Sequence, residues 1–195
     1  MIKKISIIFS FLILAIIVFF LFQNFLLKKN SGEKISLGDT NQTLENKNNL
    51  IKNLRYDVNF ENNTKYNITA DLSELIYEGS DEIVKMQKVR AVFIDKGGLP
   101  LIITSDNAVF NNTSYNTSFT NNVKIEYINN KMGSGRLLLD FENNVVIIND
   151  NIVYEGVQGM GEADNIRIDL ITKDVQIFMN NSNNKVKIKS KKNNE

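Results

Sequence analysis

The chain has 195 residues, 23 basic and 22 acidic side chains, and neither Cys nor His. This length allows one domain with a substantial core, and the absence of Cys and His excludes disulfides, Cys/His metal sites and Ser-His or Cys-His nucleophile pairs. The balanced charge provides no broad basic face, so nucleic acid is not an expected partner, and we expect no catalytic residue, metal or cofactor.

Residues 5–27 (ISIIFSFLILAIIVFFLFQNFLL) contain no charged side chain. As an α-helix this segment would measure about 34 Å, enough to cross the ~30 Å hydrocarbon core of a bilayer. The alternative is a cleaved signal peptide, which has a shorter apolar core followed by small residues. Here Lys28 and Lys29 follow, and no such cleavage site is present. We therefore expect an uncleaved anchor, with residues 1–4 in the cytoplasm and the remainder exported.

Residues 28–55 are rich in Asn, Lys, Ser and Gly, which is typical of a polar tether. We expect one short helix within it, around residues 44–54. From residue 56 to 195 the pattern changes to short, β-branched and often alternating segments separated by Asn, Gly and Asp clusters. This pattern predicts an all-β domain of about nine to eleven strands.

A repeat runs through the predicted β domain. Its copies have apolar or small residues at the first and third positions and Asp or Asn at the fourth, and they lie at residues 108–111 (AVFN), 137–140 (LLLD) and 166–169 (IRID). We expect the fourth side chain to close a turn by bonding nearby backbone. We also expect turns between strands at residues 104–106, 133–135 and 161–164 and at the Asn-rich pairs 121–122 and 150–151. A weaker relative of the repeat lies at residues 68–71.

The segment GVQGMGEADNIRID, residues 156–169, places three glycines close together and superficially resembles a phosphate-binding loop. Such a loop must open a helix, whose amide groups and dipole hold the anion. Here a strand is predicted from Ala163 onward, so Gly156, Gly159 and Gly161 are expected to turn the chain between two strands.

With these segments in order, the chain resembles the LptC family, the membrane-anchored components of the lipopolysaccharide-export machine of Gram-negative bacteria. The resemblance covers the whole length and rests on the order and spacing of the segments. The most informative stretches are YNITA (66–70), LPLIITSDNAVFNN (99–112), which we expect to be a hairpin, NNVKIEY (121–127) and GMGEADNIRIDLITKDVQIF (159–178).

The resemblance implies a twisted, open β-jellyroll of repeated hairpin units in the periplasm, held at the inner membrane by residues 5–27. It also implies transport without catalysis: lipopolysaccharide is received from an ATP-driven inner-membrane transporter with subunits of the LptF/LptG type and passed to a periplasmic bridge protein of the LptA type. The acyl chains would lie in an apolar groove. The expected lining residues are Ala70, Leu72, Ala91, Phe93, Ala108, Phe110, Val123, Ile125, Leu137, Leu139, Ile166, Ile168, Val175 and Ile177.

Near the end of the chain, KVKIKSKK (residues 185–192) alternates Lys with Val186 and Ile188, as an edge strand would. One interpretation is that its lysines prevent unwanted pairing. The other is a docking edge for a partner, or a contact to lipid phosphates. The proposed docking residues are Lys185, Val186, Lys187, Ile188 and Lys189.

Two alternatives to lipid transport remain open from the residues alone. The same alternation would also fill a closed core, which predicts an anchored β-sandwich scaffold of a cell-envelope assembly without lipid binding. An envelope hydrolase based on Asp or Glu is the second alternative, although no base or nucleophile accompanies the carboxylate pairs.

Overall fold

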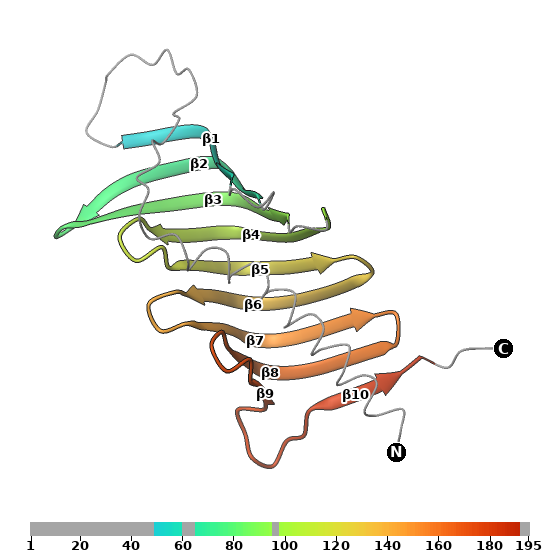
Figure 1. Ribbon diagram of the computed structural model, residues 1–195. Coiled ribbons are helices and arrows are strands. Elements are labelled where there is room, and N and C mark those ends of the chain that lie inside the picture. The colour runs from blue at the N-terminus through green and yellow to red at the C-terminus, as the bar shows by residue number, and fades with distance from the viewer. Residues whose placement is uncertain (1–48, 60–64, 95–97, 192–195) are drawn as a thin grey trace.

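The computed structural model describes residues 49–59, 65–94 and 98–191, and over these residues the protein is an open antiparallel sheet of ten strands without a helix (Figure 1). This confirms the predicted all-β class. The order is β1 to β8 and then β10, with β9 also paired to β8. The strands are β1 Asn49–Asn59, β2 Lys65–Glu78, β3 Asp81–Ile94, β4 Pro100–Asn111, β5 Thr117–Tyr127, β6 Asn130–Asp140, β7 Val145–Gly156, β8 Gly159–Asp169, β9 Val175–Phe178 and β10 Lys187–Ser190.

The predicted anchor and the tail before it lie outside the described residues. Among the residues that are described, no helix is long and apolar enough to span a membrane. The short helix predicted around residues 44–54 is wrong over residues 49–54, which form the first half of β1. Pairing with β2 on both halves of β1 outweighs the weak helical preference of this Asn-containing stretch. The described sheet therefore includes residues 49–55 of the predicted tether.

The strands bend at a common level near their middles. The register shifts at this level between β4 and β5, β5 and β6, β6 and β7, and β7 and β8. Such bulges bend a strand and increase its twist. Left-handed backbone occurs at the same level in alternate strands, at Asn53, Lys88, Asn121, Asn122, Asp150 and Asn151. Asn and Asp tolerate this conformation better than most residues, so the Asn-rich pairs allow the sheet to fold along one line.

We call this level the bend line, and the two halves of the sheet the first and second limbs. In β4 the first limb is residues 100–105 and the second limb is residues 107–111. At the carboxyl end, β10 pairs with residues 159–162 of β8 in the first limb, whereas β9 pairs with residues 165–168 in the second. The two limbs thus have separate final strands.

The bend line corrects several predicted turns. Residues 104–106, 133–135 and 161–164 lie within β4, β6 and β8, and the pairs 121–122 and 150–151 lie within β5 and β7. The stretch LPLIITSDNAVFNN is not a hairpin either, because it contains the single bent strand β4. Likewise, Asp71 lies in the middle of β2 and not at a turn. Asn, Asp and Gly serve mid-strand bulges and turns for the same conformational reason, so the sequence pattern did not distinguish them.

The predicted role of the repeat at strand ends is confirmed. Its three copies end β4, β6 and β8, and each fourth residue closes the turn that follows. Asn111 Oδ1 accepts hydrogen bonds from the backbone N–H groups of Thr113 (2.8 Å) and Ser114 (3.0 Å). Asp140 Oδ1 accepts one from Asn143 N–H (3.0 Å). Asp169 Oδ1 accepts two, from Ile171 (2.9 Å) and Thr172 (2.8 Å).

The glycine-rich segment contains a turn and also provides a surface against which β10 of the same chain packs. Gly156 and Gly159 pair with each other across a two-residue connection, which confirms the turn predicted there, whereas Gly161 lies inside β8. A Cβ atom on Gly159 would collide with the backbone carbonyl oxygen of Lys189 in β10. This glycine therefore also leaves room for the last strand to approach β8.

Candidate functional site

The interior between the two limbs is apolar and continuous across the sheet. Directly paired residues form rows that cross one strand after another. In the first limb one such row is Ile68, Ala91, Ile103, Ile125, Met132 and Tyr154. In the second limb a row is Leu75, Val84, Phe110, Thr117, Leu139, Val146, Ile168 and Val175.

Most of the predicted lining residues lie in this interior. Nine belong to the buried core cluster: Ala70, Ala91, Ala108, Val123, Ile125, Leu137, Leu139, Ile166 and Ile168. Four more are half-buried and pack against that cluster: Phe93, Phe110, Val175 and Ile177. Contact of these residues with lipid stays a prediction.

Leu72 is the exception among the predicted lining residues. It is half-buried, and its cross-strand partners are the exposed side chains of Lys52 and Gln87. The alternation of faces shifts by one residue at the bend line, so Ser73 is buried instead, with 1% exposure. Among the residues that the structure describes, the Ser73 hydroxyl has no hydrogen-bond partner. The prediction assumed that every second residue of β2 faces the interior without interruption. It therefore chose Leu72, one residue before the true inward position at Ser73.

Many interior residues were absent from the predicted set although they obey the same alternation. Phe119 is fully buried, and Tyr154 is 1% exposed, with its hydroxyl donating to Asn130 Oδ1 at 2.6 Å. The missed residues could have been identified from the sequence, because they occupy alternate positions in the same strands. They include Ile68, Met86, Leu101, Ile103, Phe119, Met132, Val146, Ile148, Ile152 and Tyr154.

A small cavity lies at the carboxyl end of the interior, where β9 and β10 separate from each other. Its volume is about 30 Å³, and its lining includes Ile152 of β7, Ala163 of β8, Ile177 of β9 and Ile188 of β10. Pockets for small molecules typically measure ~300–1,000 Å³. This cavity is therefore too small to hold an acyl chain unless the surrounding strands move.

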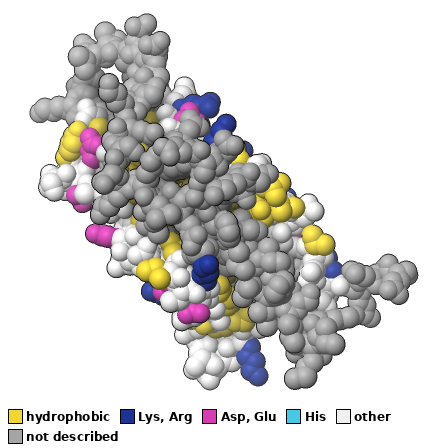
Figure 2. All heavy atoms as spheres, in the orientation of Figure 1, with side chains coloured by type: hydrophobic (Ala, Val, Ile, Leu, Met, Phe, Trp, Pro, Cys, Tyr) yellow, Lys and Arg dark blue, Asp and Glu magenta, His cyan; other side chains and the backbone are white. Residues whose placement is uncertain are grey.

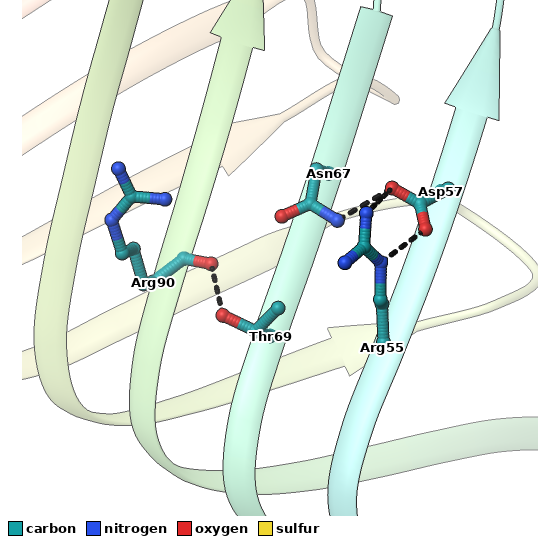
Figure 3. A network of polar contacts seen from close by, with 5 residues as sticks. All are labelled: Arg55, Asp57, Asn67, Thr69 and Arg90. Atoms are coloured by element: carbon teal, nitrogen blue, oxygen red, sulfur yellow. Dashed lines mark hydrogen bonds and ion pairs between the residues drawn. The ribbon is translucent and has the colours of Figure 1, made fainter. Parts of the chain in front are cut away.

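The outer face of the sheet carries charges of both signs. On the surface drawn in Figure 2, basic and acidic side chains lie among hydrophobic and other side chains. On β1 to β3, Asp57 accepts hydrogen bonds from Arg55 Nε and Asn67 Nδ2, both at 2.6 Å (Figure 3). The hydrogen bond from Arg55 lowers the pKa of the Asp57 carboxyl group. The adjacent Thr69 hydroxyl donates to the backbone oxygen of Arg90 at 3.3 Å.

A polar cluster also covers the outside of the bend line. Asp106 accepts hydrogen bonds from Asn122 Nδ2 (2.5 Å) and from Lys88 Nζ (3.3 Å), and these two contacts lower the pKa of its carboxyl group. Lys88 and Asn122 both have left-handed backbone. The cluster therefore joins β3, β4 and β5 at the level where their backbones bend, which stabilises the angle between the limbs.

The predicted docking segment is divided between a connection and a strand. Lys185 and Val186 precede β10, while Lys187, Ile188 and Lys189 lie in it. As predicted, β10 is an edge strand, and all four of its residues are exposed. Lys187 Nζ donates to Glu162 Oε2 at 2.8 Å, and Lys191 Nζ donates to Glu155 Oε1 at 3.2 Å. The role of residues 185–189 in docking to a partner protein stays a prediction.

Comparison with known proteins identifies one family. A family model described as "Lipopolysaccharide-assembly, LptC-related" matches residues 11–194. No curated protein matches the chain significantly.

Proposed function

The chain belongs to the LptC-related family of lipopolysaccharide-assembly proteins, and on this premise we propose that it relays lipopolysaccharide through its apolar interior. The family is a lipid-transport family of the cell envelope and not a known enzyme family. Membership supports a role in lipopolysaccharide export. The route of the lipid, the location of the protein and its partners are our proposal.

The observation that carries this proposal is the continuous apolar interior. Its rows run across the strands, from β2 to β7 in the first limb and from β2 to β9 in the second. Exposing an acyl chain of about a dozen CH₂ groups to water would cost roughly 10 kcal/mol, at ~0.8 kcal/mol for each group. A lipid carrier in an aqueous compartment therefore needs such a continuous apolar path.

The division of the sheet into two limbs supports the proposal that it is the twisted, open β-jellyroll expected for this family. In that arrangement the limbs are the two walls of a groove, and the bend line is its closed side. Acyl chains would separate the walls and replace contacts that the side chains of the two limbs make with each other. Apart from Leu72, the predicted lining residues, from Ala70 in β2 to Ile177 in β9, lie in this interior.

We also propose where the protein is located and which partners give and receive the lipopolysaccharide. Residues 5–27 anchor the protein in the inner membrane, and the sheet lies in the periplasm. The protein accepts lipopolysaccharide from an LptF/LptG-type transporter and passes it to an LptA-type bridge. The two ends of the sheet support edge-to-edge docking, because β1 lies at one end and β9 and β10 lie at the other. We place the bridge contact at residues 185–189.

A photo-crosslinking pair in β5 tests the relay. Ile125 is 5% exposed and faces the interior, whereas the adjacent Lys124 is exposed on the outer face. In cells, a photoreactive residue at position 125 should form an ATP-dependent adduct with lipopolysaccharide, and the same residue at position 124 should not. Adducts at neither position, with the protein folded and exported, would reject the relay.

That negative result would support the scaffold alternative. The specific observation in its favour is that the interior is filled by its own side chains, with Phe119 and Ala91 fully buried and Tyr154 at 1% exposure. A closed core of this kind would not admit lipid. Edge-to-edge docking of β10 would then be the main activity of the domain, and cross-links from position 188 to a partner protein should persist without lipid.

A further inference from the structure

Five aromatic rings form a chain at the β1 end of the interior. Phe93 stacks on Tyr66 with ring centroids 4.4 Å apart. Tyr66 meets the ring of Tyr56 edge-on at 6.4 Å, and Tyr56 lies 6.5 Å from Phe110. Phe110 in turn lies 6.3 Å from Tyr115. We call these five residues the aromatic bridge.

One contact in the aromatic bridge joins the two limbs. Tyr56 pairs with Ile68 in the first limb, whereas Phe110 pairs with Thr117 in the second. Their strands, β1 and β4, are separated by β2 and β3 in the sheet. Strands three positions apart lie ~14 Å apart within a sheet. The 6.5 Å ring contact therefore crosses the interior and does not follow from strand pairing.

The bridge also lies at the margin of the core. Tyr56, Phe93 and Phe110 are half-buried and pack against the buried cluster, while Tyr66 is 9% exposed. Burial raises the pKa of the Tyr66 phenol, so this side chain stays neutral at physiological pH. The stacked pair of Tyr66 and Phe93 is thus a neutral, apolar surface beside the contact between the limbs.

Tyr56 and Phe110 are suited to separate. The contact consists of two planar rings, and tyrosine has an apolar body with a polar tip that water can solvate if the ring turns outward. An acyl chain that replaced the Tyr56 ring would preserve the apolar contact of Phe110 and Tyr66. Opening at this point would therefore expose little apolar surface once the chain had entered.

We propose that the Tyr56–Phe110 contact is a gate that an acyl chain opens when it enters the interior from the β1 end. The stacked rings of Tyr66 and Phe93 are the first surface that the chain meets. This inference rests on the proposed lipid relay, and it adds the point of entry and the residues that move.

A single tryptophan can report on the gate, because the chain contains none. We would prepare the full chain in phospholipid nanodiscs as Phe110→Trp, with Tyr56→Trp as a second reporter if the first variant folds poorly. Val109→Trp is the matched control, since Val109 is the neighbouring residue in β4 and is exposed on the outer face. Displacement of a fluorescent fatty-acyl probe would measure lipopolysaccharide binding independently.

Lipopolysaccharide should displace the probe and shift the tryptophan emission at position 110 or 56, but not at position 109. Displacement of the probe with no emission change at positions 110 and 56 would overturn the gate and leave the relay intact. Failure to bind the probe or lipopolysaccharide would reject the relay, and the gate with it. The two failures are therefore distinguishable.

A reversible cross-link provides the functional test. The chain has no cysteine, so Tyr56→Cys with Phe110→Cys can be joined by a cleavable bismaleimide without side reactions at other thiols. Joining the two positions should abolish uptake of lipopolysaccharide, and cleavage of the linker should restore it. The control joins Thr104→Cys to Lys124→Cys, which are paired on adjacent strands. Unchanged uptake in the joined 56–110 variant would overturn the gate.

Discussion

The two ends of the sheet are built differently. At one end, β1 is a single strand that crosses the bend line and pairs with β2 in both limbs, from Asn49 to Asn59. At the other end, β8 pairs with two separate four-residue strands, β9 in the second limb and β10 in the first (Figure 1). A strand that spans both limbs ties them together, whereas two short strands leave them independent. We therefore expect the β1 end to hold the limb angle and the β10 end to adapt.

The largest expected effect comes from the centre, on which both ends depend. Phe119→Ala removes a fully buried ring from β5 and should lower the free energy of unfolding by about 3–5 kcal/mol. Urea denaturation measures this, and amide exchange should accelerate in both β1 and β10. The control is Phe178→Ala in β9, where the ring is 46% exposed and the cost should be about 0.5 kcal/mol or less. Similar losses for the two variants would contradict a shared core.

A second change should affect the β10 end alone. Gly159→Ala introduces a Cβ that collides with the Lys189 carbonyl oxygen, so β10 must move away from β8 at a cost of about 1–3 kcal/mol. Amide exchange should accelerate in β10 and stay unchanged in β1. Gly133→Ala is the control, because an added methyl group there would have no atom of the described residues within 4 Å and the backbone is not left-handed. Equal amide exchange rates in β10 for the Gly159→Ala and Gly133→Ala variants would argue that Gly159 is not needed for β10 to pack against β8.

A third prediction concerns the β1 end and has the opposite sign. The buried Ser73 hydroxyl, opposite Ile51 of β1, lacks a hydrogen-bond partner within the described part of the chain, so Ser73→Ala should raise the free energy of unfolding by about 1 kcal/mol. Ser105 is also buried, but its hydroxyl donates to the backbone oxygen of Asn107 at 2.8 Å. Ser105→Ala should therefore lower the stability by about 1 kcal/mol. A loss of stability in both variants would show that Ser73 has a partner in solution.

The smallest effect is electrostatic and concerns the β10 end. The hydrogen bond from Lys187 lowers the pKa of the Glu162 carboxyl group below its usual value of 4.5. A lowered pKa means that this contact supports β10 above about pH 4.5 and that the support is lost as the pH falls through the folded-state value. Amide exchange in β10 should therefore accelerate with acid, and Glu162→Gln should remove that dependence. An unchanged pH profile in the variant would contradict this assignment.

The inward positions were predictable because they depend on a local rule. Alternation along each strand identified Ile125, Leu137 and Ile166 as interior residues, and the fourth residue of the repeat identified turn closure by Asp140 and Asp169. Both effects involve neighbours within a few residues. Local patterns of this kind survive in the folded chain because tertiary contacts do not oppose them.

The bend line and the limb contacts were not predictable in the same way. Asn121 and Asn122 carry the same composition signal in a mid-strand bend as in a turn, and only pairing of β5 with both neighbours separates the two cases. The contact of Tyr56 with Phe110 has no local signature, because it depends on how two halves of a folded sheet face each other. These features are tertiary, and they include the candidate gate.

The repeat copies at residues 108–111, 137–140 and 166–169 lie 29 residues apart, and this spacing determines how far the apolar path extends. From β4 to β8, the bend positions Asp106, Gly135 and Asp164 recur with the same spacing as the turn residues, so each repeat supplies two bent strands. Two strands lengthen a sheet by ~9.6 Å. The distance over which the apolar path extends therefore grows in equal steps with the number of repeats. Insertion or deletion of one whole repeat would lengthen or shorten this path while preserving its cross-section.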